Sequence, residues 1–449
     1  MTWFVLAFCV AVLPNTILVD WIPKGPAGLN LQNVIIATAL MILLGTVAEP
    51  KAPSQPHWPK LARTIVLYLA LAFAACWYGV LFTGWVGLPA GLDDFRLTDW
   101  RDELTGGLMF FLAAKCIKTE DQIKKVLVVL VIASAYFVGY YLVLYYPEVG
   151  RINALPMPRG IDPKQWDEDK KWMIKALAGV FVHLQSNEMA AYYLYVGMFF
   201  TGLFWHYRSA FWRILVPIEV ALLFLGVVYS ASRGAMLSAA AAVAYSFFRK
   251  QKWLVRVTFL ACAAIPAFGG GTEGLDASAA TRLELWNHAF RMGLRYPLGV
   301  GYRLFSTKHK IDYSLKLDTH NFFMRCWAEL GPGGFLLMAL FFLGAIKLGW
   351  ILHDSARSDF SRGMGRGCAL MWASAVICNL FGDRLSYVPI GVPVWTLTGL
   401  TMALLIIEER DRIAEAEMSL GTVSRTSIPV GAGGTVPVPD YADEPRGFG

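Results

Sequence analysis

The feature that most constrains this chain is a repeated apolar run of roughly twenty residues, long enough as a helix to cross the ~30 Å hydrocarbon core of a bilayer. The 449 residues are 56% hydrophobic and 16% charged, whereas soluble domains carry about 45–50% apolar and about 25% charged residues. The runs are continuously apolar, unlike the alternating strands of a membrane β-barrel. The sequence therefore predicts an all-α polytopic membrane protein and excludes a soluble enzyme.

About twelve such segments follow one another, and helices of roughly twenty residues would use about half of the chain. The segments lie at 3–22, 29–47, 64–86, 104–117, 126–147, 188–206, 212–230, 234–248, 254–268, 333–350, 367–382 and 392–407. Boundaries from such patterns are good to a few residues. We expect membrane helices 1–9 within residues 1–268 and membrane helices 10–12 within residues 333–407.

Two long polar stretches interrupt the apolar pattern, at 148–187 and 269–332, and these have enough polar residues to build a site. One set of short loops carries seventeen lysines and arginines and the opposite set carries five. Because cytoplasmic loops are enriched in basic residues, we expect both termini inside and both long stretches outside, with amphipathic helices in the second. The Gly-, Pro- and Ser-rich end of the chain predicts a disordered cytoplasmic tail at 408–449.

The stretch from Thr281 has the pattern T-R-L-E, which predicts a capping box of Thr281 and Glu284 at the start of a helix that ends at Arg295. An apolar face that can lie on the membrane domain is formed by Leu283, Trp286, Phe290 and Leu294.

Arg291 and Arg295 share another face of this predicted helix, one turn apart. Two guanidinium groups at this spacing suit a phosphate or pyrophosphate, because each can bind oxygens through two hydrogen bonds. Contact with lipid headgroups is the alternative for both residues.

A second helix is expected to begin after Asp318, with Thr319 as the N-cap and His320 and Asn321 in the first turn. A histidine there meets the positive end of the helix dipole, which disfavours the imidazolium form. Neutral imidazole can take a proton from a hydroxyl. His320 is therefore a candidate general base, or else a polar residue facing water. Arg325 and Glu329, four residues apart, can pair with each other.

Further charged residues lie where apolar segments begin or end. Arg233 separates two segments so closely that it must lie at the mouth of the helix bundle, although its side chain could also reach lipid headgroups. Asn187 and Glu188 open another segment at a similar depth. The adjacent Asp383 and Arg384 could form a structural ion pair.

Neither a metal nor another cofactor is expected. The acidic pairs and triplets at 93–94 and 167–169 could in principle bind Mg²⁺, but no further ligand lies at a suitable spacing. The motifs of ATP-binding loops and of common hydrolases are absent from the sequence.

Several short motifs together resemble the O-antigen ligase and polymerase family. They are R-x3-W-x-H-A from Arg282, P-L-G-V-G-Y at 297–302, T-H-N-F-F at 319–323, A-E-L-G-P-G-G at 328–334, S-R-G at 232–234 and N-E-M-A at 187–190. The resemblance covers about residues 185–350. It implies a membrane glycosyltransferase of the GT-C type in the bacterial inner membrane, with the loop at 269–332 in the periplasm.

The resemblance also implies a reaction and its residues. A glycan would move from an undecaprenyl-pyrophosphate carrier to an acceptor hydroxyl, with inversion and without a metal. His320 matches the essential loop histidine of the family, while Arg233 and Arg282 match its pyrophosphate-binding arginines. We also expect Arg291 and Arg295 to bind the donor pyrophosphate. Supporting roles at the site are expected for Asn187, Glu188, Asn321 and Trp286.

The acceptor is left open by these residues. Lipid A–core would make the protein a ligase, a second lipid-linked repeat a polymerase, and protein serine or threonine an O-oligosaccharyltransferase. Relatives described as membrane transporters give a non-enzymatic alternative. Membrane lipids are expected partners and nucleic acids are not.

Overall fold

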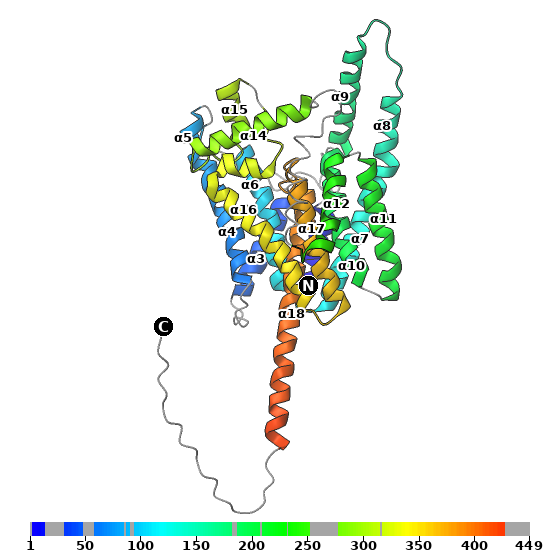
Figure 1. The fold of residues 1–449 in the computed structure, drawn as a ribbon, viewed down its shortest axis with the longest axis vertical. Helices are drawn as coiled ribbons and strands as arrows, with labels where there is room; N and C mark the ends of the chain where they lie inside the picture. Colours follow the sequence, from blue (N-terminus) through cyan, green and yellow to red (C-terminus); the bar gives the residue numbers. More distant parts are fainter. Residues whose placement is uncertain are drawn as a thin grey trace, which may run out of the picture. The chain divides into compact units, whose positions relative to one another are not determined.

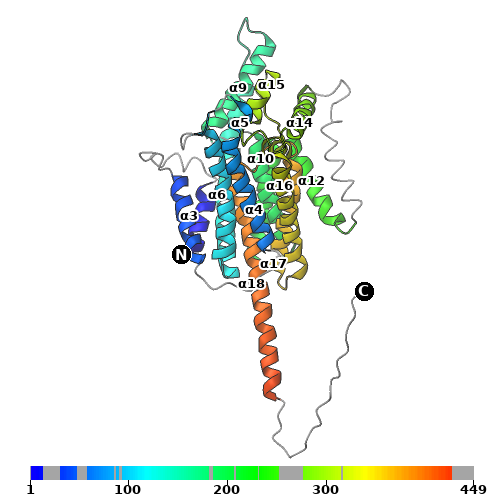
Figure 2. The ribbon, with the colours of Figure 1, turned by 90° about the vertical axis from the view of Figure 1, so that its left-hand side faces the viewer.

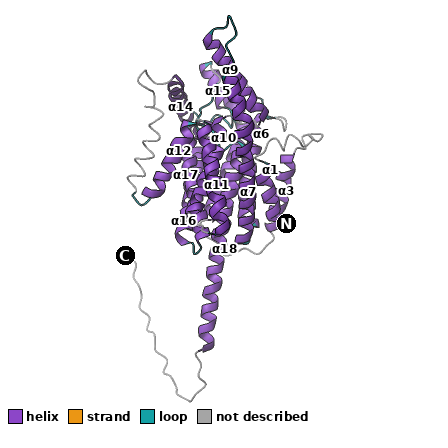
Figure 3. Cartoon of the chain, turned by 90° about the vertical axis from the view of Figure 1, so that its right-hand side faces the viewer, coloured by secondary structure: helices purple, strands orange, loops and turns teal. Residues whose placement is uncertain are grey.

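The predicted apolar segments correspond closely to helices in a computed structural model of the chain. The structure describes residues 2–13, 31–47, 58–84, 87–89, 94–181, 186–206, 209–230, 232–251, 277–314 and 317–426. Every predicted segment except 254–268, which lies outside these residues, falls at least partly on a helix. Within the described ranges there is no strand (Figure 3). The all-α prediction is therefore confirmed.

The chain divides into two units, Met1–Ile407 and Glu408–Gly449. The first half of the first unit contains α1 (Thr2–Val12), α3 (Leu31–Val47), α4 (Trp58–Tyr78), α5 (Val80–Thr83), α6 (Phe95–Cys116), α7 (Glu120–Tyr140), the π-helix η2 (Tyr141–Tyr145), α8 (Tyr146–Asn153) and α9 (Pro163–Phe181). The second half of the first unit contains α10 (Ser186–His206), α11 (Ala210–Tyr229), α12 (Arg233–Phe248), α14 (Ala277–Arg295), α15 (Phe305–Tyr313), α16 (Phe322–Ser355), α17 (Asp359–Cys378) and the first part of α18 (Val388–Thr426).

Five helices in the described residues are long and apolar enough to cross a membrane. They are Lys60–Tyr78, Glu120–Asn153, Ala210–Tyr229, Phe322–Ser355 and Val388–Met418. Two shorter apolar helices occupy Trp3–Val12 and Asn33–Leu43. The chain is thus a helical membrane protein, and the number of twelve spans stays a prediction.

α17 lies in the middle of the first unit (Figure 1), in contact with α10, α12 and α16. Glycines let these helices approach closely. A Cβ atom on Gly202 of α10 would lie 2.2 Å from the backbone nitrogen of Gly367, and one on Gly349 of α16 would lie 2.6 Å from the carbonyl oxygen of Gly365. Small residues at helix contacts are typical of membrane proteins, because dispersion between backbones replaces the hydrophobic effect there.

The loop that follows α14 packs against a break in α16. Gly331 adopts φ 68° and ψ −173°, a conformation essentially restricted to glycine. Pro332 follows it and has no N–H group, so the carbonyl of Ala328 loses its helical partner. The N–H groups of Val300 and Gly301 donate instead to the carbonyls of Ala328 and Glu329, over 2.9 and 3.0 Å. The P-L-G-V-G-Y motif at 297–302 therefore packs against the A-E-L-G-P-G-G motif at 328–334.

Four helices outside the candidate membrane spans lie at one end of the bundle. Figures 1 and 2 show α5, α9, α14 and α15 there, with α14 packed on α16. The long polar stretches expected to lie outside therefore contain helices: α8 and α9 in the first, and α14 and α15 in the second. These helices carry or surround the candidate site.

The second unit begins within a helix. α18 continues through Glu408 to Thr426, so the disorder predicted for 408–449 does not hold over its first part. Its sequence there is rich in Glu, Ala and Arg, which favour helix. Residues 427–449 lie outside the described residues.

Candidate functional site

His320 lies in a tight turn immediately before α16. Asn321, not Thr319, is the N-cap: its side chain accepts from the N–H groups of Phe323 and Met324 over 3.0 and 3.1 Å. His320 therefore precedes the helix, with a left-handed φ of 48°. The predicted first-turn position is wrong, because an asparagine cap satisfies two N–H groups of the first turn.

The backbone around His320 is fixed from two sides. Trp286 of α14 donates from Nε1 to the carbonyl of Thr319 over 3.0 Å. The N–H of Phe322 donates to the carbonyl of Asn379 over 2.9 Å, which joins the turn to the end of α17. Thr319 is buried, whereas His320 is exposed. The histidine ring is thus held on a fixed backbone at an accessible position.

Two arginines act on His320 electrostatically. The protein atoms around His320 partly shield its accessible ring from water, which lowers its pKa; Asp318 raises the pKa, and Arg282 and Arg384 lower it further. The predicted neutral imidazole is thus favoured, but by partial shielding from water and by neighbouring cations, since the residue precedes the helix. A histidine with a pKa below its ordinary value is a competent base near neutral pH.

Arg384 is fixed by its own contacts. Its Nη1 donates to Glu188 Oε1 over 3.2 Å, and its backbone N–H donates to Asn379 Oδ1 over 3.1 Å. The residue before it, Asp383, contacts other arginines, so these two neighbours do not form the pair that their adjacency indicated. Asn187, beside Glu188 at the start of α10, is exposed.

Arg233 is the first residue of α12, and its side chain is exposed. The next residue, Gly234, packs against Phe381: a Cβ atom on the glycine would lie 3.3 Å from that of Phe381. α12 therefore begins beside the segment that carries Arg384. We call four residues from different parts of the chain the exposed basic group. Two of them, Arg233 and His320, are exposed, and the other two, Arg282 and Arg384, are partly exposed.

The other two predicted donor ligands lie elsewhere. At 3.6 residues per turn, Arg291 lies about 180° around α14 from Arg282. Arg291 and Arg295 are both exposed, and Trp286, which contacts the His320 turn, is about 40° from Arg282. The structure therefore does not bring Arg291 and Arg295 to His320.

The start and the buried face of α14 also differ from the prediction. The helix begins at Ala277, so Thr281 lies inside it and forms no capping box with Glu284. Leu285, Ala289 and Met292 form the buried face, whereas the predicted face includes the exposed Phe290 and Leu294. The predicted end at Arg295 is confirmed.

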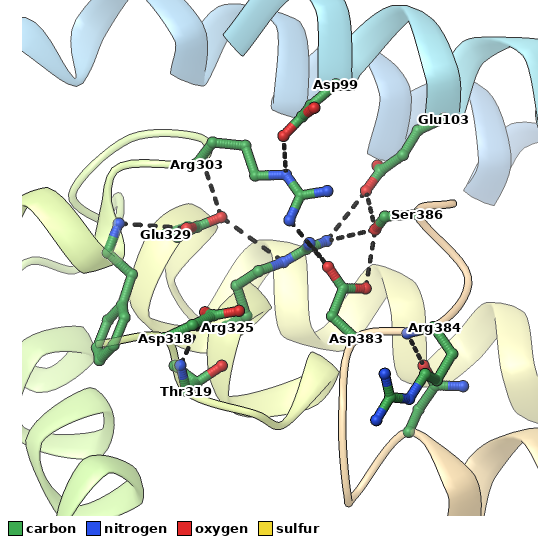
Figure 4. Close-up of polar contacts among 12 residues, drawn as sticks. Asp99, Glu103, Arg303, Asp318, Thr319, Arg325, Glu329, Asp383, Arg384 and Ser386 are labelled. Atoms are coloured by element: carbon green, nitrogen blue, oxygen red, sulfur yellow. Dashed lines mark hydrogen bonds and ion pairs between the residues drawn. The ribbon is translucent and has the colours of Figure 1, made fainter. Parts of the chain in front are cut away.

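A second set of charged side chains lies deeper, between α6, α16 and the segment that joins α17 to α18 (Figure 4). We call it the buried charge cluster; its members are Asp99, Glu103, Arg303, Arg325, Glu329, Asp383 and Ser386.

Arg325 is at the centre of this cluster, with its side chain 2% exposed. Its Nη2 donates to Glu103 Oε1 over 3.0 Å and to Ser386 Oγ over 3.1 Å. Its Nη1 donates to Asp383, and its Nε lies 3.7 Å from Glu329 Oε2. The predicted Arg325–Glu329 contact is present, but as part of a larger network.

Arg303 supplies the second cation, from a left-handed residue in the loop after α14. Its Nη1 donates to Asp383 Oδ2 over 2.9 Å, and its Nε lies 2.8 Å from Asp99 Oδ2. Glu329 accepts from the backbone N–H groups of Arg303 and Phe305 over 2.9 and 3.2 Å. The cluster therefore joins α6, this loop, α16 and the Asp383 segment.

The two arginines of the cluster face four carboxyl groups, and Asp383 contacts both arginines. Burial raises the pKa of Asp383, but Arg325 and Arg303 lower it by more, so the carboxyl stays ionised. Removing one partner of a buried pair leaves an uncompensated charge. Asp99, Glu103 and Arg303 were not predicted from the sequence. A signal was present for Glu103, because a carboxylate next to an apolar span is costly unless it is paired.

Possible metal ligands do not converge. In the described parts of the chain, no three His, Cys, Asp or Glu side chains are grouped as in a metal site. Asp94 instead caps α6, accepting from the N–H of Arg96 over 2.9 Å, and its Oδ2 lies 2.7 Å from the Arg96 guanidinium.

Comparison with known proteins bears on the segment that carries most of these residues. Residues 174–339 match the family described as O-antigen ligase, and no curated protein matches the chain. The matched segment contains Glu188, Arg233, Arg282 and His320 and includes the break in α16. The resemblance drawn from the motifs is thereby confirmed. Residues 174–339 are thus similar to the O-antigen ligase family.

Proposed function

We propose that this protein is a membrane glycosyltransferase that moves a glycan from undecaprenyl-pyrophosphate to an acceptor hydroxyl. The observation that carries the proposal is the position of His320 within the matched segment: its side chain is accessible, and Arg282 and Arg384 are close enough to lower its pKa. A base and fixed cations at one place are what this transfer needs. The hydroxyl is a weak nucleophile, and the leaving pyrophosphate gains negative charge.

In the proposed reaction, His320 acts on the acceptor and three arginines act on the donor. His320 takes the proton of the acceptor hydroxyl while that oxygen forms a bond to the anomeric carbon. The bond from this carbon to the pyrophosphate oxygen breaks on the opposite face, which inverts the anomeric centre. Arg233, Arg282 and Arg384 bind the departing lipid pyrophosphate, and the reaction uses no metal. Arg384 joins this list because of its position, and its partner Glu188 holds it in place.

Three further residues support this arrangement. Trp286 and Asn321 set the backbone on either side of His320, through the carbonyl of Thr319 and through the N-cap. Asn187 is exposed next to Glu188. We assign to it a polar contact with the donor. Arg291 and Arg295 take no part here, since they lie on the opposite face of α14.

The acceptor we favour is lipid A–core, which makes the protein an O-antigen ligase. Polymerisation of lipid-linked repeats and transfer to protein serine or threonine use the same residues and are the alternatives. A transporter would need polar groups across the membrane. Apart from the members of the buried charge cluster, the candidate membrane spans in the described residues bury one carboxylate. It is Glu219, which accepts a hydrogen bond from Ser134. A single buried carboxylate does not form a transport pathway across the membrane, so we favour the enzyme.

The exposed basic group faces the periplasm of the inner membrane in this proposal, with both termini in the cytoplasm. The distribution of basic residues supports that orientation. A cysteine in place of the exposed Lys310 should react with a membrane-impermeant thiol reagent in cells whose inner membrane is intact. Labelling only after the membrane is disrupted would reverse the orientation.

A reconstituted reaction tests the activity. Purified protein in detergent receives a lipid-pyrophosphate glycan and, in separate reactions, lipid A–core, a second lipid-linked repeat or a serine-containing peptide. We expect product with lipid A–core in the presence of EDTA, together with release of undecaprenyl-pyrophosphate. Product with another acceptor would reassign the protein within the family. An absolute requirement for Mg²⁺ would contradict the metal-independent mechanism.

A further inference from the structure

One face of α14, which begins about 40° around the helix from Trp286, carries large exposed apolar side chains. Phe290 is 47% exposed and Leu294 is 60% exposed, and Leu298, just after the helix, is 66% exposed. At about 100° per residue, Phe290 and Leu294 lie within about 40° of each other on the helix surface. Exposed apolar residues that are contiguous indicate a surface with a partner.

This apolar face continues onto a membrane-spanning helix. The ring of Phe290 stacks on Trp327 of α16, with centroids 5.7 Å apart, and Trp327 Nε1 donates to the carbonyl of Phe290 over 3.1 Å. Trp327 in turn contacts Phe335 edge-on, with centroids 5.8 Å apart. Farther along α16, three exposed leucines lie at helical spacing: Leu336, Leu340 and Leu343. Because α16 is one of the candidate membrane spans, these leucines are in position to contact lipid.

Two exposed cations flank the apolar face of α14. Arg291 and Arg295 lie one turn apart, about 100° around the helix from Phe290 and Leu294. Within the described residues, neither makes an ion pair, although the guanidinium of Arg295 lies 5.6 Å from the ring centre of Tyr296. The acidic residue on this side is Glu284, two turns before Arg291, and it contacts His288 at 4.0 Å. The C-terminal half of this face is therefore positively charged.

We infer that α14 lies in the membrane–water interface and binds the headgroups of anionic phospholipids through Arg291 and Arg295. An apolar face beside arginines is the pattern of a helix that rests in the plane of the bilayer surface. The apolar side chains enter the lipid in line with the exposed leucines of α16, and the guanidiniums reach the phosphate level. This function is separate from donor binding, and it fixes the height of Trp286 and the His320 turn above the bilayer.

Photo-crosslinking tests this inference with the full-length protein. A benzoylphenylalanine replaces Leu294, or Leu298 in a second variant, in nanodiscs with equal amounts of phosphatidylglycerol and phosphatidylcholine. Both positions are exposed, so the fold should tolerate the replacement. We expect phospholipid adducts at both, with phosphatidylglycerol favoured about fivefold, because each cation near an anionic surface adds to its attraction. The same residue in place of Asp167 on α9, which extends away from the bundle (Figure 1), should give none.

The double substitution R291Q/R295Q should reduce the preference for phosphatidylglycerol to about one while keeping the adducts. The matched control R159Q/K164Q removes two exposed cations, one just before α9 and one in its first turn, and should keep the preference. Absence of lipid adducts at positions 294 and 298 would overturn the interfacial placement. Adducts with no lipid preference, or a preference that survives R291Q/R295Q, would overturn the headgroup site.

Discussion

The buried charge cluster and the exposed basic group use the same residue types for different purposes. Arg325 has its side chain 2% exposed and contacts three carboxylates and a hydroxyl, whereas Arg233 and His320 are exposed at the ends of their elements. Arg384 is intermediate, with a side chain 14% exposed and an ion pair with Glu188. A charge that the protein itself compensates belongs to the scaffold, and one left to solvent is available to a ligand.

The two regions are joined through short backbone segments. Asp383, in the cluster, is followed at once by Arg384, in the basic group. Likewise, Arg325 lies in the first turn and a half of α16, five residues after His320. We therefore expect changes in the cluster to act first on stability, and changes in the basic group to act on transfer alone.

The largest expected effect is that of Arg325→Met. Removal of the guanidinium leaves Glu103 and Asp383 buried without their main cation, which costs about 3–5 kcal/mol. Thermal unfolding of the purified protein, followed by tryptophan fluorescence, should show a large drop in the midpoint. A change within error of the wild type would mean that the cluster does not stabilise the fold, and the comparison would fail.

Arg233→Lys and Arg384→Lys test the basic group. Lysine keeps the charge but lacks the planar fork that binds two phosphate oxygens. We expect transfer to fall by about 10²-fold in each variant, as when one donor to a transition-state anion is lost, with the unfolding midpoint unchanged. Arg151→Lys on the exposed face of α8 is the matched control and should retain activity. Near-normal turnover of Arg233→Lys would place that side chain at the lipid headgroups instead.

The smallest effect concerns pH. Asp318 raises the pKa of His320, so Asp318→Asn should lower it, and the asparagine can still accept from the N–H of Thr319 as Asp318 does. Because the neutral imidazole is the active form, transfer should persist to lower pH in the variant, and the acid limb of kcat/KM should move down. An acid limb at the wild-type position would show that His320 does not control it.

The sequence was sufficient for features that depend on local patterns. Long apolar runs located the long apolar helices of the first unit but not α9, α14 or α15. The end of α14 at Arg295 follows from Pro297 and the glycines after it. The start of α14 was placed too late, because Thr281 fits a capping box while the preceding A-S-A-A also favours helix. For the same reason, the Glu- and Ala-rich residues after 407 extend α18.

Tertiary contacts account for what the sequence did not predict. Arg325 and Glu103 are 222 residues apart and Arg303 and Asp383 are 80 apart, so no spacing rule joins them. The neighbours of His320 are another case. Arg282 was predicted, but Arg384 was assigned to the adjacent Asp383, since only the fold shows that Asp383 is already bound by two other arginines.

The most direct test of the central claim is the His320→Ala variant, measured for both transfer and stability. The side chain is exposed and its backbone is fixed by Trp286 and Asn379, so the unfolding midpoint should equal that of the wild type. Transfer from the lipid-pyrophosphate donor to lipid A–core should fall by about 10²- to 10⁴-fold, the range expected for loss of a general base. Transfer within a few-fold of the wild type would show that His320 is not the base.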